Sequence, residues 1–397
     1  MFERLERMPD DPILGLMAAF RADADTRKVD LGVGVYRNDK GDTPVLDAVR
    51  KAEAAVLSRQ TSKTYVAPAG NPGFNQAMEK LVFGDNHPTV KAGRVKTIQA
   101  PGGCGALRVG AELIHQAFPD ATIHVSTPTW ANHVPLLTGS GIKLEHYPYY
   151  DAATGGVNFN AMIDTLGKLP KGQIVLLHGS CHNPTGADLS EQQWRDVLKV
   201  VQKNGLVPYI DMAYQGLGQG LAEDAFGARL FAAELPEVLV AVSCSKNFGL
   251  YRERTGSLSV ITDSPARADA IITQLVRIAR KIYSMPPDHG AAIVNEILNN
   301  EALRSSWDSE LGSMRSRIAG LRTEVVARLK KSAPQRDFSF IERQRGMFSF
   351  LGVNKDQVRE LREKHHVYMT DDSRINIAGL KSDNIGYFAD AVADVVK

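Results

Sequence analysis

The run Val-Leu-Val-Ala-Val-Ser-Cys-Ser, residues 238–245, decides how the rest of the chain is read. Its apolar, β-branched residues lie between Pro236 and Gly249, as in a strand that a parallel sheet buries on both faces. Lys246 follows directly, and Arg254 lies eight positions further on. A desolvated lysine near another cation has a lowered pKa and becomes a nucleophile for Schiff-base chemistry. The alternative is a surface lysine just past a strand, since charged side chains are mostly exposed.

The composition is that of a soluble globular protein. The chain has 397 residues, of which 43% are hydrophobic and 23% charged, enough for two domains with cores of their own. A net charge of +2 gives no electrostatic footprint for nucleic acid or an anionic membrane, and no apolar stretch approaches the roughly 20 residues that span a bilayer. Three cysteines and no signal-peptide pattern favour a reducing compartment. We expect a cytoplasmic protein without nucleic-acid or membrane partners.

Short apolar runs alternate with amphipathic stretches through the middle of the chain. The runs that predict strands are 95–100, 122–126, 173–178, 206–211, 238–245 and 256–261. A helix is predicted between the third and fourth runs, because Ser190 and Gln193 form a capping box and Gly205 can end the helix. The alternation predicts an α/β fold with a mostly parallel sheet between layers of helices.

The last part of the chain has a different pattern. A long amphipathic helix is predicted from about Leu311, and a closing helix from Ser382. Between them the sequence predicts strands at 338–341, 347–351, 367–369 and 374–377, and a helix over 355–364. We therefore expect a smaller α+β domain over 311–397, a large domain over 45–310, and an N-terminal arm over 1–44 that packs partly with the small domain. Ligands commonly bind in a cleft between such domains.

Polar groups follow several of the predicted strands, at the sheet edge where open α/β sheets bind ligands. The strand 95–100 runs into the glycine-rich stretch 101–106. Glycines at a turn from a strand into a helix expose backbone N–H groups at the positive end of the helix, which suits a phosphate. A tight turn without a ligand is the alternative, and the stretch does not fit the dinucleotide-binding fingerprint.

The strand 173–178 is followed by a Cys/His-containing segment, 178–186. Its spacing matches no common zinc site and no second Cys/His pair follows, so we expect no metal. Asn183 precedes Pro184, which favours an extended backbone and allows the amide to point into the cleft. The alternative is a plain turn.

The strand 206–211 ends in Asp211, and Tyr214 follows. A carboxylate at the end of an apolar strand is costly without a cationic partner, and a protonated ring nitrogen would serve as one. Tyr214 could donate to an adjacent oxygen. Taken singly, Asp211 could equally be a helix cap and Tyr214 a core aromatic residue.

Together these groups form one set: an amine, an acid for a ring nitrogen, and donors for a phenolate oxygen. The phosphate ligands of the set are Ser243, Ser245, Arg254 and the glycine turn, and Trp130 could stack on a ring face. This set describes pyridoxal 5′-phosphate.

The motifs that carry a family resemblance run through the whole chain. They are Leu-Gly-Val-Gly-Val-Tyr (31–36), Pro-Gly-Gly-Cys-Gly-Ala-Leu-Arg (101–108), His-Asn-Pro-Thr-Gly (182–186), Asp-x-Ala-Tyr-Gln-Gly (211–216), Ser-x-Ser-Lys-Asn-Phe-Gly-Leu-Tyr-x-Glu-Arg (243–254), Tyr-Ser-x-Pro-Pro (283–287) and Arg-Ile-Asn-Ile-Ala-Gly (374–379). The chain resembles the class I (aspartate/aromatic amino acid) aminotransferases among the fold-type I pyridoxal-phosphate enzymes. The resemblance implies a seven-stranded, mostly parallel sheet plus a smaller domain.

The resemblance also implies roles for single residues. Lys246 would hold the cofactor as a Schiff base and later move the substrate proton, while Asp211 would pair with the ring nitrogen. The other cofactor contacts it implies are Asn183 and Tyr214 at the phenolate oxygen, Trp130 on the ring face, and Gly103, Cys104, Ser243, Ser245, Arg254 and the partner subunit's Tyr65 around the phosphate.

For the substrate, the resemblance implies that Arg374 clamps the α-carboxylate with a bidentate guanidinium. Arg280 from the partner chain would read a side-chain carboxylate, and Gly34, Trp130 and Asn183 would complete the substrate site. Without the resemblance, Arg280 is one of several basic residues on a predicted solvated helix face. Because Tyr65 and Arg280 would act across the interface, the resemblance implies a homodimer with shared active sites.

The activity implied is transfer of the amino group of aromatic (Tyr, Phe, Trp) and dicarboxylic (Asp, Glu) amino acids to 2-oxo acids such as 2-oxoglutarate, with ping-pong kinetics. Two positions depart from the usual aspartate-specific pattern: Cys104 replaces a hydroxyl residue, and Met285 replaces an asparagine near the substrate arginine. A flexible apolar Met285 favours aromatic substrates. A strictly aspartate-specific aminotransferase is the alternative.

Two further alternatives belong to other classes of protein. A nicotinamide-dependent dehydrogenase would need the glycine fingerprint that the chain lacks, and it leaves Lys246 unexplained. A pyridoxal-phosphate-sensing regulator would need an appended basic DNA-binding domain, for which there is no room before Val29.

Overall fold

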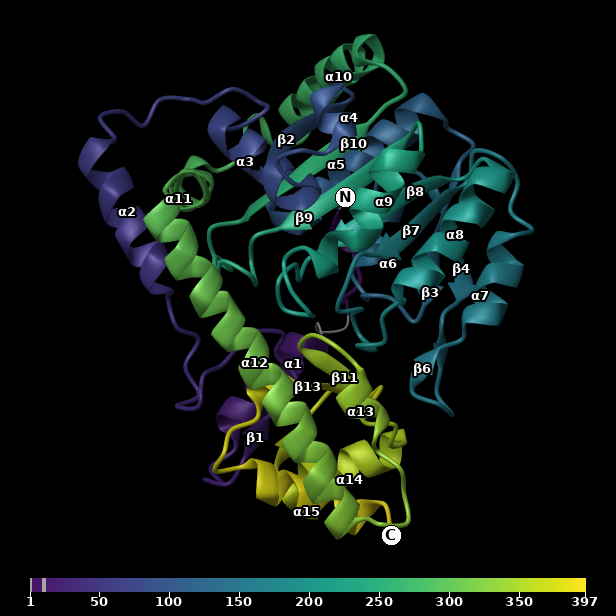
Figure 1. Ribbon diagram of the computed structural model, residues 1–397. Helices are drawn as coiled ribbons and strands as arrows, with labels where there is room; N and C mark the ends of the chain where they lie inside the picture. The colour runs from purple at the N-terminus through teal and green to yellow at the C-terminus, as the bar shows by residue number, and fades with distance from the viewer. Residues whose placement is uncertain (1, 9–11) are drawn as a thin grey trace.

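The computed structural model describes residues 2–8 and 12–397 (Figure 1). Its centre is a seven-stranded sheet in the order β2-β10-β9-β8-β7-β3-β4. The strands are β2 (Val95–Pro101), β10 (Thr255–Ile261), β9 (Val238–Ser243), β8 (Val207–Met212), β7 (Ile174–His178), β3 (Thr122–Thr127) and β4 (Lys143–Pro148). Only β10 runs antiparallel to its neighbours in this sheet, so the predicted mostly parallel sheet is confirmed.

The sheet is buried on both faces. Alternate residues of β9 fall into two separate hydrophobic clusters, with Val238, Val240 and Val242 in one and Leu239 and Ala241 in the other. Helices α5, α6 and α10 contribute to the second cluster, whereas α3, α8, α9 and α11 contribute to the first. This burial explains why the run 238–245 reads as continuously apolar.

The helices of this part confirm the capping signals. Helix α8 (Glu191–Asn204) begins with the predicted Ser190–Gln193 capping box and ends at Gly205, which is left-handed. The other helices here are α2 (Asp47–Arg59), α3 (Pro72–Phe83), α4 (Pro88–Lys91), α5 (Gly102–Ala117), α6 (His133–Thr138), α7 (Phe159–Leu166), α9 (Phe226–Glu234), α10 (Pro265–Tyr283) and α11 (Asp288–Asn299). Short elements are η1 (Phe2–Arg4), η2 (Glu223–Ala225) and the hairpin β5 (Tyr150–Asp151) with β6 (Gly156–Val157).

Strand β4 and two boundaries differ from the sequence prediction. No strand was predicted at Lys143–Pro148; β4 is an edge strand, and its polar residues are largely exposed. Strand β9 ends at Ser243, so Lys246 lies in a turn rather than directly at the strand end. Helix α5 begins at Gly102 itself, so the glycines form the first turn of the helix and not a loop before it.

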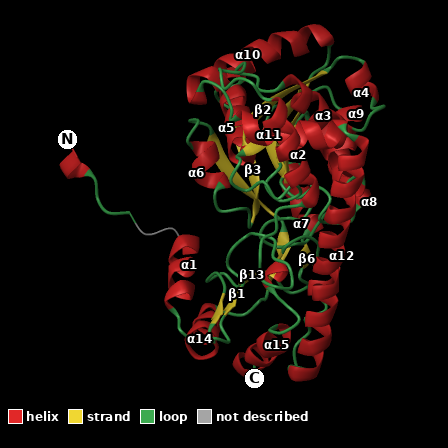
Figure 2. Cartoon of the chain, turned by 90° about the vertical axis from the view of Figure 1, so that its left-hand side faces the viewer, coloured by secondary structure: helices red, strands yellow, loops and turns green. Residues whose placement is uncertain are grey.

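The long helix α12 (Glu301–Ser332) connects this sheet to a second structural unit (Figures 1 and 2). It begins ten residues before the predicted start at Leu311, because Asn300 caps it by accepting from Leu303 N at 3.2 Å. Its buried Arg322 donates to the backbone of the segment 341–349. Figure 2 shows α12 along one side of the molecule and α1 (Pro12–Ala22) on the other.

The second unit combines both ends of the chain. Strand β1 (Val29–Asp30) pairs in parallel with β12 (Val367–Tyr368), and β11 (Phe348–Phe350) pairs antiparallel with β13 (Arg374–Asn376). Helices α14 (Lys355–His365) and α15 (Ile385–Val395) and the turn η3 (Ile377–Gly379) complete it. The strand predicted at 338–341 is wrong: short helix α13 (Phe340–Arg343) starts there, and Phe338 and Ile341 are both buried at a helix-turn spacing. Within the described residues no helix is long and apolar enough to cross a membrane.

Candidate active site

A cavity of about 300 Å³ lies at the carboxyl ends of β7, β8 and β9. Twelve of the fourteen site residues predicted from the sequence line it. They are Gly34, Gly103, Cys104, Trp130, Asn183, Asp211, Tyr214, Ser243, Ser245, Lys246, Arg254 and Arg374. The chain ends contribute as well, because Ile13 of α1 and Phe348 of β11 are part of the wall.

Two predicted site residues lie elsewhere. Tyr65 is 90% exposed, and Arg280 lies on the exposed side of α10. Neither lines the cavity of its own chain. Met285 lies beside the Tyr65 loop, where its sulfur accepts from Val66 N at 3.2 Å.

Lys246 is placed for nucleophilic chemistry. Its Nζ lies 5.0 Å from the centroid of the Tyr214 ring. Burial lowers the pKa of the Lys246 amine and Arg254 adds to this effect, whereas Asp211 and Cys104 oppose it. A lowered pKa increases the share of neutral, nucleophilic amine near neutral pH.

Asp211 is held by a histidine that the sequence reading missed. Its Oδ2 lies 3.0 Å from His133 Nε2, and His133 Nδ1 lies 2.8 Å from Thr129 Oγ1, which also contacts His178 Nε2 at 3.1 Å. Burial raises the pKa of Asp211, but the hydrogen bond and charge of His133, with smaller contributions from His178 and Lys246, lower it overall. Asp211 therefore remains a carboxylate, which suits a cationic partner in the cavity.

His178 belongs to the same network, which it joins through Thr129. Burial lowers its pKa to about 3, and His133 adds to the lowering, so the ring is neutral at physiological pH. Its ring lies 4.0 Å from that of His182, which in turn stacks on Tyr149 at 4.2 Å. Neutral, packed rings fix the position of Thr129 and His133 beneath Asp211.

One end of the cavity suits an anion. A Cβ at Gly102, where φ is +70°, would lie 2.5 Å from Arg254 Nη2, so only glycine lets the guanidinium lie against the first turn of α5. Ser243 borders Gly103, and its Oγ accepts from Ser245 N at 3.2 Å. Helix N-terminal amides, hydroxyls and a guanidinium are ligands that phosphate prefers.

Arg374 is another basic residue of the cavity wall. Its Nη2 donates to Gly32 O at 2.8 Å and its guanidinium lies 4.5 Å from the Phe348 ring centroid. Burial lowers the pKa of Arg374. Gly34 lies close to the same ring, since a Cβ there would be 3.0 Å from Phe348 Cζ.

Three buried polar atoms of the cavity wall have no hydrogen-bond partner among the described residues: Asn183 Oδ1, Ser180 Oγ and Arg374 Nε. Buried polar groups are normally hydrogen-bonded, so unpartnered ones at a cavity indicate a ligand. The described residues contain no group of three or more His, Cys, Asp or Glu side chains that could hold a metal ion. The wall therefore fits an organic cofactor with an anionic end, a ring with a basic nitrogen, and a carbonyl near Lys246.

The sequence reading also missed Tyr251, whose hydroxyl accepts from Tyr36 N at 3.0 Å and which lines the cavity. It lies within the quoted motif 243–254, but no side-chain pattern marked it. His133 comes seven residues after the end of the predicted strand 122–126, so the rule about strand ends did not single it out. His178 was noticed only as part of a Cys/His cluster.

Comparisons with known proteins agree with this geometry. The profile of the family "Aminotransferase class I and II" matches residues 26–392. The aspartate aminotransferase of Pseudomonas aeruginosa is 43% identical over 396 residues, and the aromatic-amino-acid aminotransferase of Paracoccus denitrificans 44% identical over 395; each match covers 100% of both chains. The crystal structure of the aromatic-amino-acid aminotransferase from Burkholderia pseudomallei, covalently bound to pyridoxal phosphate, has a TM-score of 0.98 at 46% identity, covering 100% of each chain.

A profile match over most of the chain and relatives above 40% identity throughout confirm the family that the motifs indicated. The chain belongs to the class I and II aminotransferases, and it is an enzyme of that family.

Proposed function

We propose that this aminotransferase binds pyridoxal 5′-phosphate through Lys246 and moves the amino group of aromatic and dicarboxylic amino acids to 2-oxo acids such as 2-oxoglutarate. The observation that carries the proposal is the Lys246 amine, with its lowered pKa, in a cavity that also holds Asp211 and an anion cradle. Relatives of both names match the chain at 43–44% identity, which supports the dual specificity.

Except for Tyr65, the residues that would hold the cofactor line the cavity. Asp211 would bind the ring nitrogen, Asn183 and Tyr214 the phenolate oxygen, and Trp130 would cover the ring. The phosphate would bind at Gly103, Cys104, Ser243, Ser245 and Arg254, with Tyr65 reaching in from a partner subunit. The unpartnered amide oxygen of Asn183 supports a polar ligand group at that position.

The bound cofactor supplies an electron-withdrawing ring that stabilises negative charge at the substrate Cα. The carboxylate of Asp211, itself fixed by His133, would pair with that ring nitrogen and favour its protonated form. Arg374 would hold the α-carboxylate, and Gly34 would leave room for it beside Phe348. Lys246, whose lowered pKa allows its Nζ to accept a proton, would take the proton from the substrate Cα as a general base and give it back as a general acid.

Substrate choice is assigned to groups outside this cavity. We infer that Arg280 reads side-chain carboxylates in the partner's active site, and that apolar Met285 accommodates aromatic rings near it. Two observations support an active site shared in a homodimer: Tyr65 and Arg280 do not line their own cavity, and Met285 contacts the Tyr65 loop. A strictly aspartate-specific enzyme remains the second candidate, since several relatives carry that name. We place the protein in the cytoplasm. We also propose that the chain divides into an N-terminal arm over 1–44, a large domain over 45–310 and a small domain over 311–397.

The test compares kcat/KM for tyrosine and aspartate with 2-oxoglutarate as acceptor. Activity on both amino acids with parallel double-reciprocal lines is expected; activity on aspartate alone would favour the second candidate. The purified protein should show a visible absorption band that borohydride abolishes, and Lys246→Ala should lack both the band and the activity. Mixing Lys246→Ala with Arg280→Ala subunits should restore aspartate activity only if Arg280 acts across the interface.

A further inference from the structure

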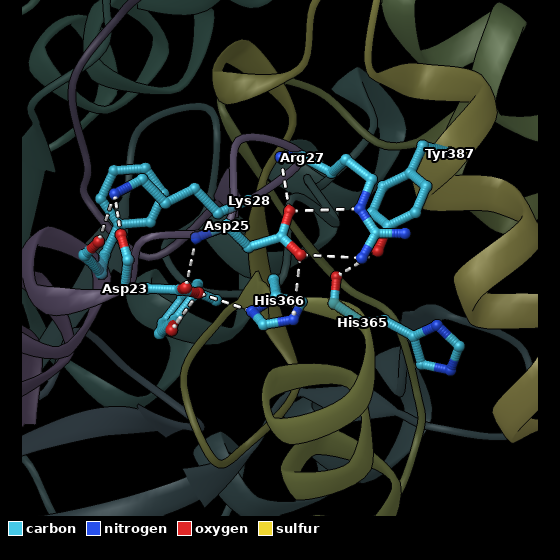
Figure 3. Close-up of polar contacts among 9 residues, drawn as sticks. Asp23, Asp25, Arg27, Lys28, His365, His366 and Tyr387 are labelled. Carbon is cyan, nitrogen blue, oxygen red and sulfur yellow. Dashed lines mark hydrogen bonds and ion pairs between the residues drawn. The ribbon is translucent and has the colours of Figure 1, made fainter.

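A cluster of charged side chains joins the two ends of the chain, away from the cavity (Figure 3). His366, just after α14, lies between two carboxylates of the segment that follows α1: Nδ1 is 2.7 Å from Asp23 Oδ2, and Nε2 is 3.3 Å from Asp25 Oδ2. All three side chains are partly buried. Figure 3 shows the ring of neighbouring His365 pointing away from these carboxylates.

Other groups hold the two carboxylates in place. The Tyr368 hydroxyl donates to Asp23 Oδ2 at 2.8 Å, and Arg27 donates to Asp25 at 3.1 and 2.7 Å. A hydrogen bond from Asp25 N, with Tyr368 and His366, lowers the pKa of Asp23 to about 2, and Arg27 and His366 lower that of Asp25. Both carboxylates are therefore ionised throughout the range in which histidines titrate.

This cluster lies at one end of a continuous path to the substrate site. Val29 N donates to His366 O at 2.9 Å and Leu31 N to Tyr368 O at 2.8 Å. The next residue, Gly32, accepts from Arg374 Nη2 at 2.8 Å. Leu16 of α1 packs against Gly32, where any Cβ would collide with it, and Ile13 of the same helix lines the cavity.

We propose that His366 is a positioning residue, whose imidazole ring fastens segment 23–31 to the C-terminal unit and so holds Gly32, Arg374 and α1 in place for the substrate carboxylate. Each of its two ring nitrogens faces one of the two aspartates, so one side chain connects to both. The role assigned to Arg374 rests on the proposed function.

Several other charged or titratable groups surround His366. Those groups are Asp23 and Asp25 after α1, Tyr368 on β12, and, further out, Arg27, Lys28, His365, Arg362 and Tyr387. Arg27 and Lys28 already have partners: Arg27 bonds Asp25, and Lys28 Nζ donates to the carbonyls of Phe20 and Asp23. Among the described residues, the side chains that contact the two ring nitrogens are thus the carboxylates of Asp23 and Asp25.

The first experiment measures how strongly segment 23–31 is held in place. Asn tolerates the left-handed conformation of position 366, where φ is 53°, so His366→Asn removes the two ties with little backbone cost. Amide hydrogen exchange of the PLP-loaded enzyme should show about fivefold lower protection of Val29 and Leu31 in His366→Asn, the size expected for a partly exposed ion pair. His365→Asn is the matched control, because that ring pairs with Asp394 instead. Unchanged protection in His366→Asn would overturn the proposal.

The second experiment measures function. With 2-oxoglutarate, His366→Asn should raise KM about fivefold and leave kcat nearly unchanged. His366→Arg, which keeps a permanent charge that can pair with the two carboxylates, should retain a low KM. A fall in kcat at constant KM, or a KM raised equally in His366→Asn and His366→Arg, contradicts the positioning role. If no transamination is found at all, the proposed function fails, while the exchange result still decides the fastening.

Discussion

Replacing Arg322 with methionine is the most demanding test of how the second structural unit shapes the cavity. Arg322 lies on α12 and is 2% exposed. It donates five hydrogen bonds, to Ile341 O (2.8 Å), Ser349 Oγ (2.7 Å), Arg345 O (3.2 Å), Gly346 O (2.7 Å) and Phe348 O (2.7 Å). Burial lowers its pKa to about 10, so the guanidinium is still charged at neutral pH.

The magnitude follows from these contacts. Four carbonyl oxygens lose this donor, and each carbonyl left buried without a partner costs about 1–3 kcal/mol. Against this, methionine removes the desolvation penalty of a buried charge, which is several kcal/mol. We expect a net loss of about 4 kcal/mol in the free energy of unfolding. With an unfolding entropy of about 2.1 cal/mol/K per residue for a chain of 397 residues, that loss lowers Tm by about 5 °C.

The assay combines calorimetry with kinetics. Because Phe348 lines the cavity beneath Arg374, KM for 2-oxoglutarate should rise together with the fall in Tm. Arg328→Met is the control: this exposed arginine on the same helix forms an ion pair with Glu324, four residues earlier, and its loss should change Tm by less than about 1 °C. An Arg322→Met protein whose Tm lies within 1 °C of the Arg328→Met protein would refute the reasoning, since five bonds of these lengths would then contribute nothing.

Three further predictions concern the cavity and its neighbourhood. Met285→Asn should lower kcat/KM for phenylalanine relative to aspartate by about tenfold, measured with a common acceptor; an unchanged ratio contradicts the specificity argument. Cys104→Thr should tighten pyridoxal phosphate about threefold in a dialysis titration, because a hydroxyl is a better donor than a thiol. His133→Phe should lower kcat about tenfold and move the acid limb of the activity profile to higher pH, because burial then raises the pKa of Asp211 without the opposing histidine. In the wild type, Asp211 has a lower pKa in the folded state than in the unfolded state, so it stabilises the fold at pH values above its unfolded pKa. This stabilisation is lost as the pH falls through the folded pKa. If the wild type and His133→Phe lost stability equally on the acid side, the reasoning would be contradicted.

Much of the fold could be predicted because burial on both faces leaves a strong signal in sequence. Strand β9 reads as a continuous apolar run, and the capping box at Ser190 correctly predicts the residue at which α8 begins. Strand β4 gave no such signal, because an edge strand keeps its polar side chains in water. The stretch 338–341 misled the reading, since a short apolar run looks the same in a helix turn and in a strand.

The site was predictable where chemistry follows a strand end or a glycine turn, as at Asp211 and Gly103. His133 escaped because it lies at the start of α6, beyond the loop that follows β3, and only the tertiary contact with Asp211 reveals its role. The contact between His366 and Asp23 escaped for the same reason, as the two residues are 343 positions apart in the chain. Sequence patterns report local periodicity, whereas contacts that hold the site residues in place depend on which distant segments of the chain pack together.

The reversed direction of β10 has a consequence for how this enzyme can vary. Because β9 and β10 pair antiparallel, with Ser243 opposite Gly256, the chain between them leaves and re-enters the sheet at the same rim. Lys246 and Arg254 thus lie in one connecting loop, and the pairing of β9 with β10 fixes the distance between the two ends of that loop. An added residue within 244–254 would therefore misalign the amine and the guanidinium together.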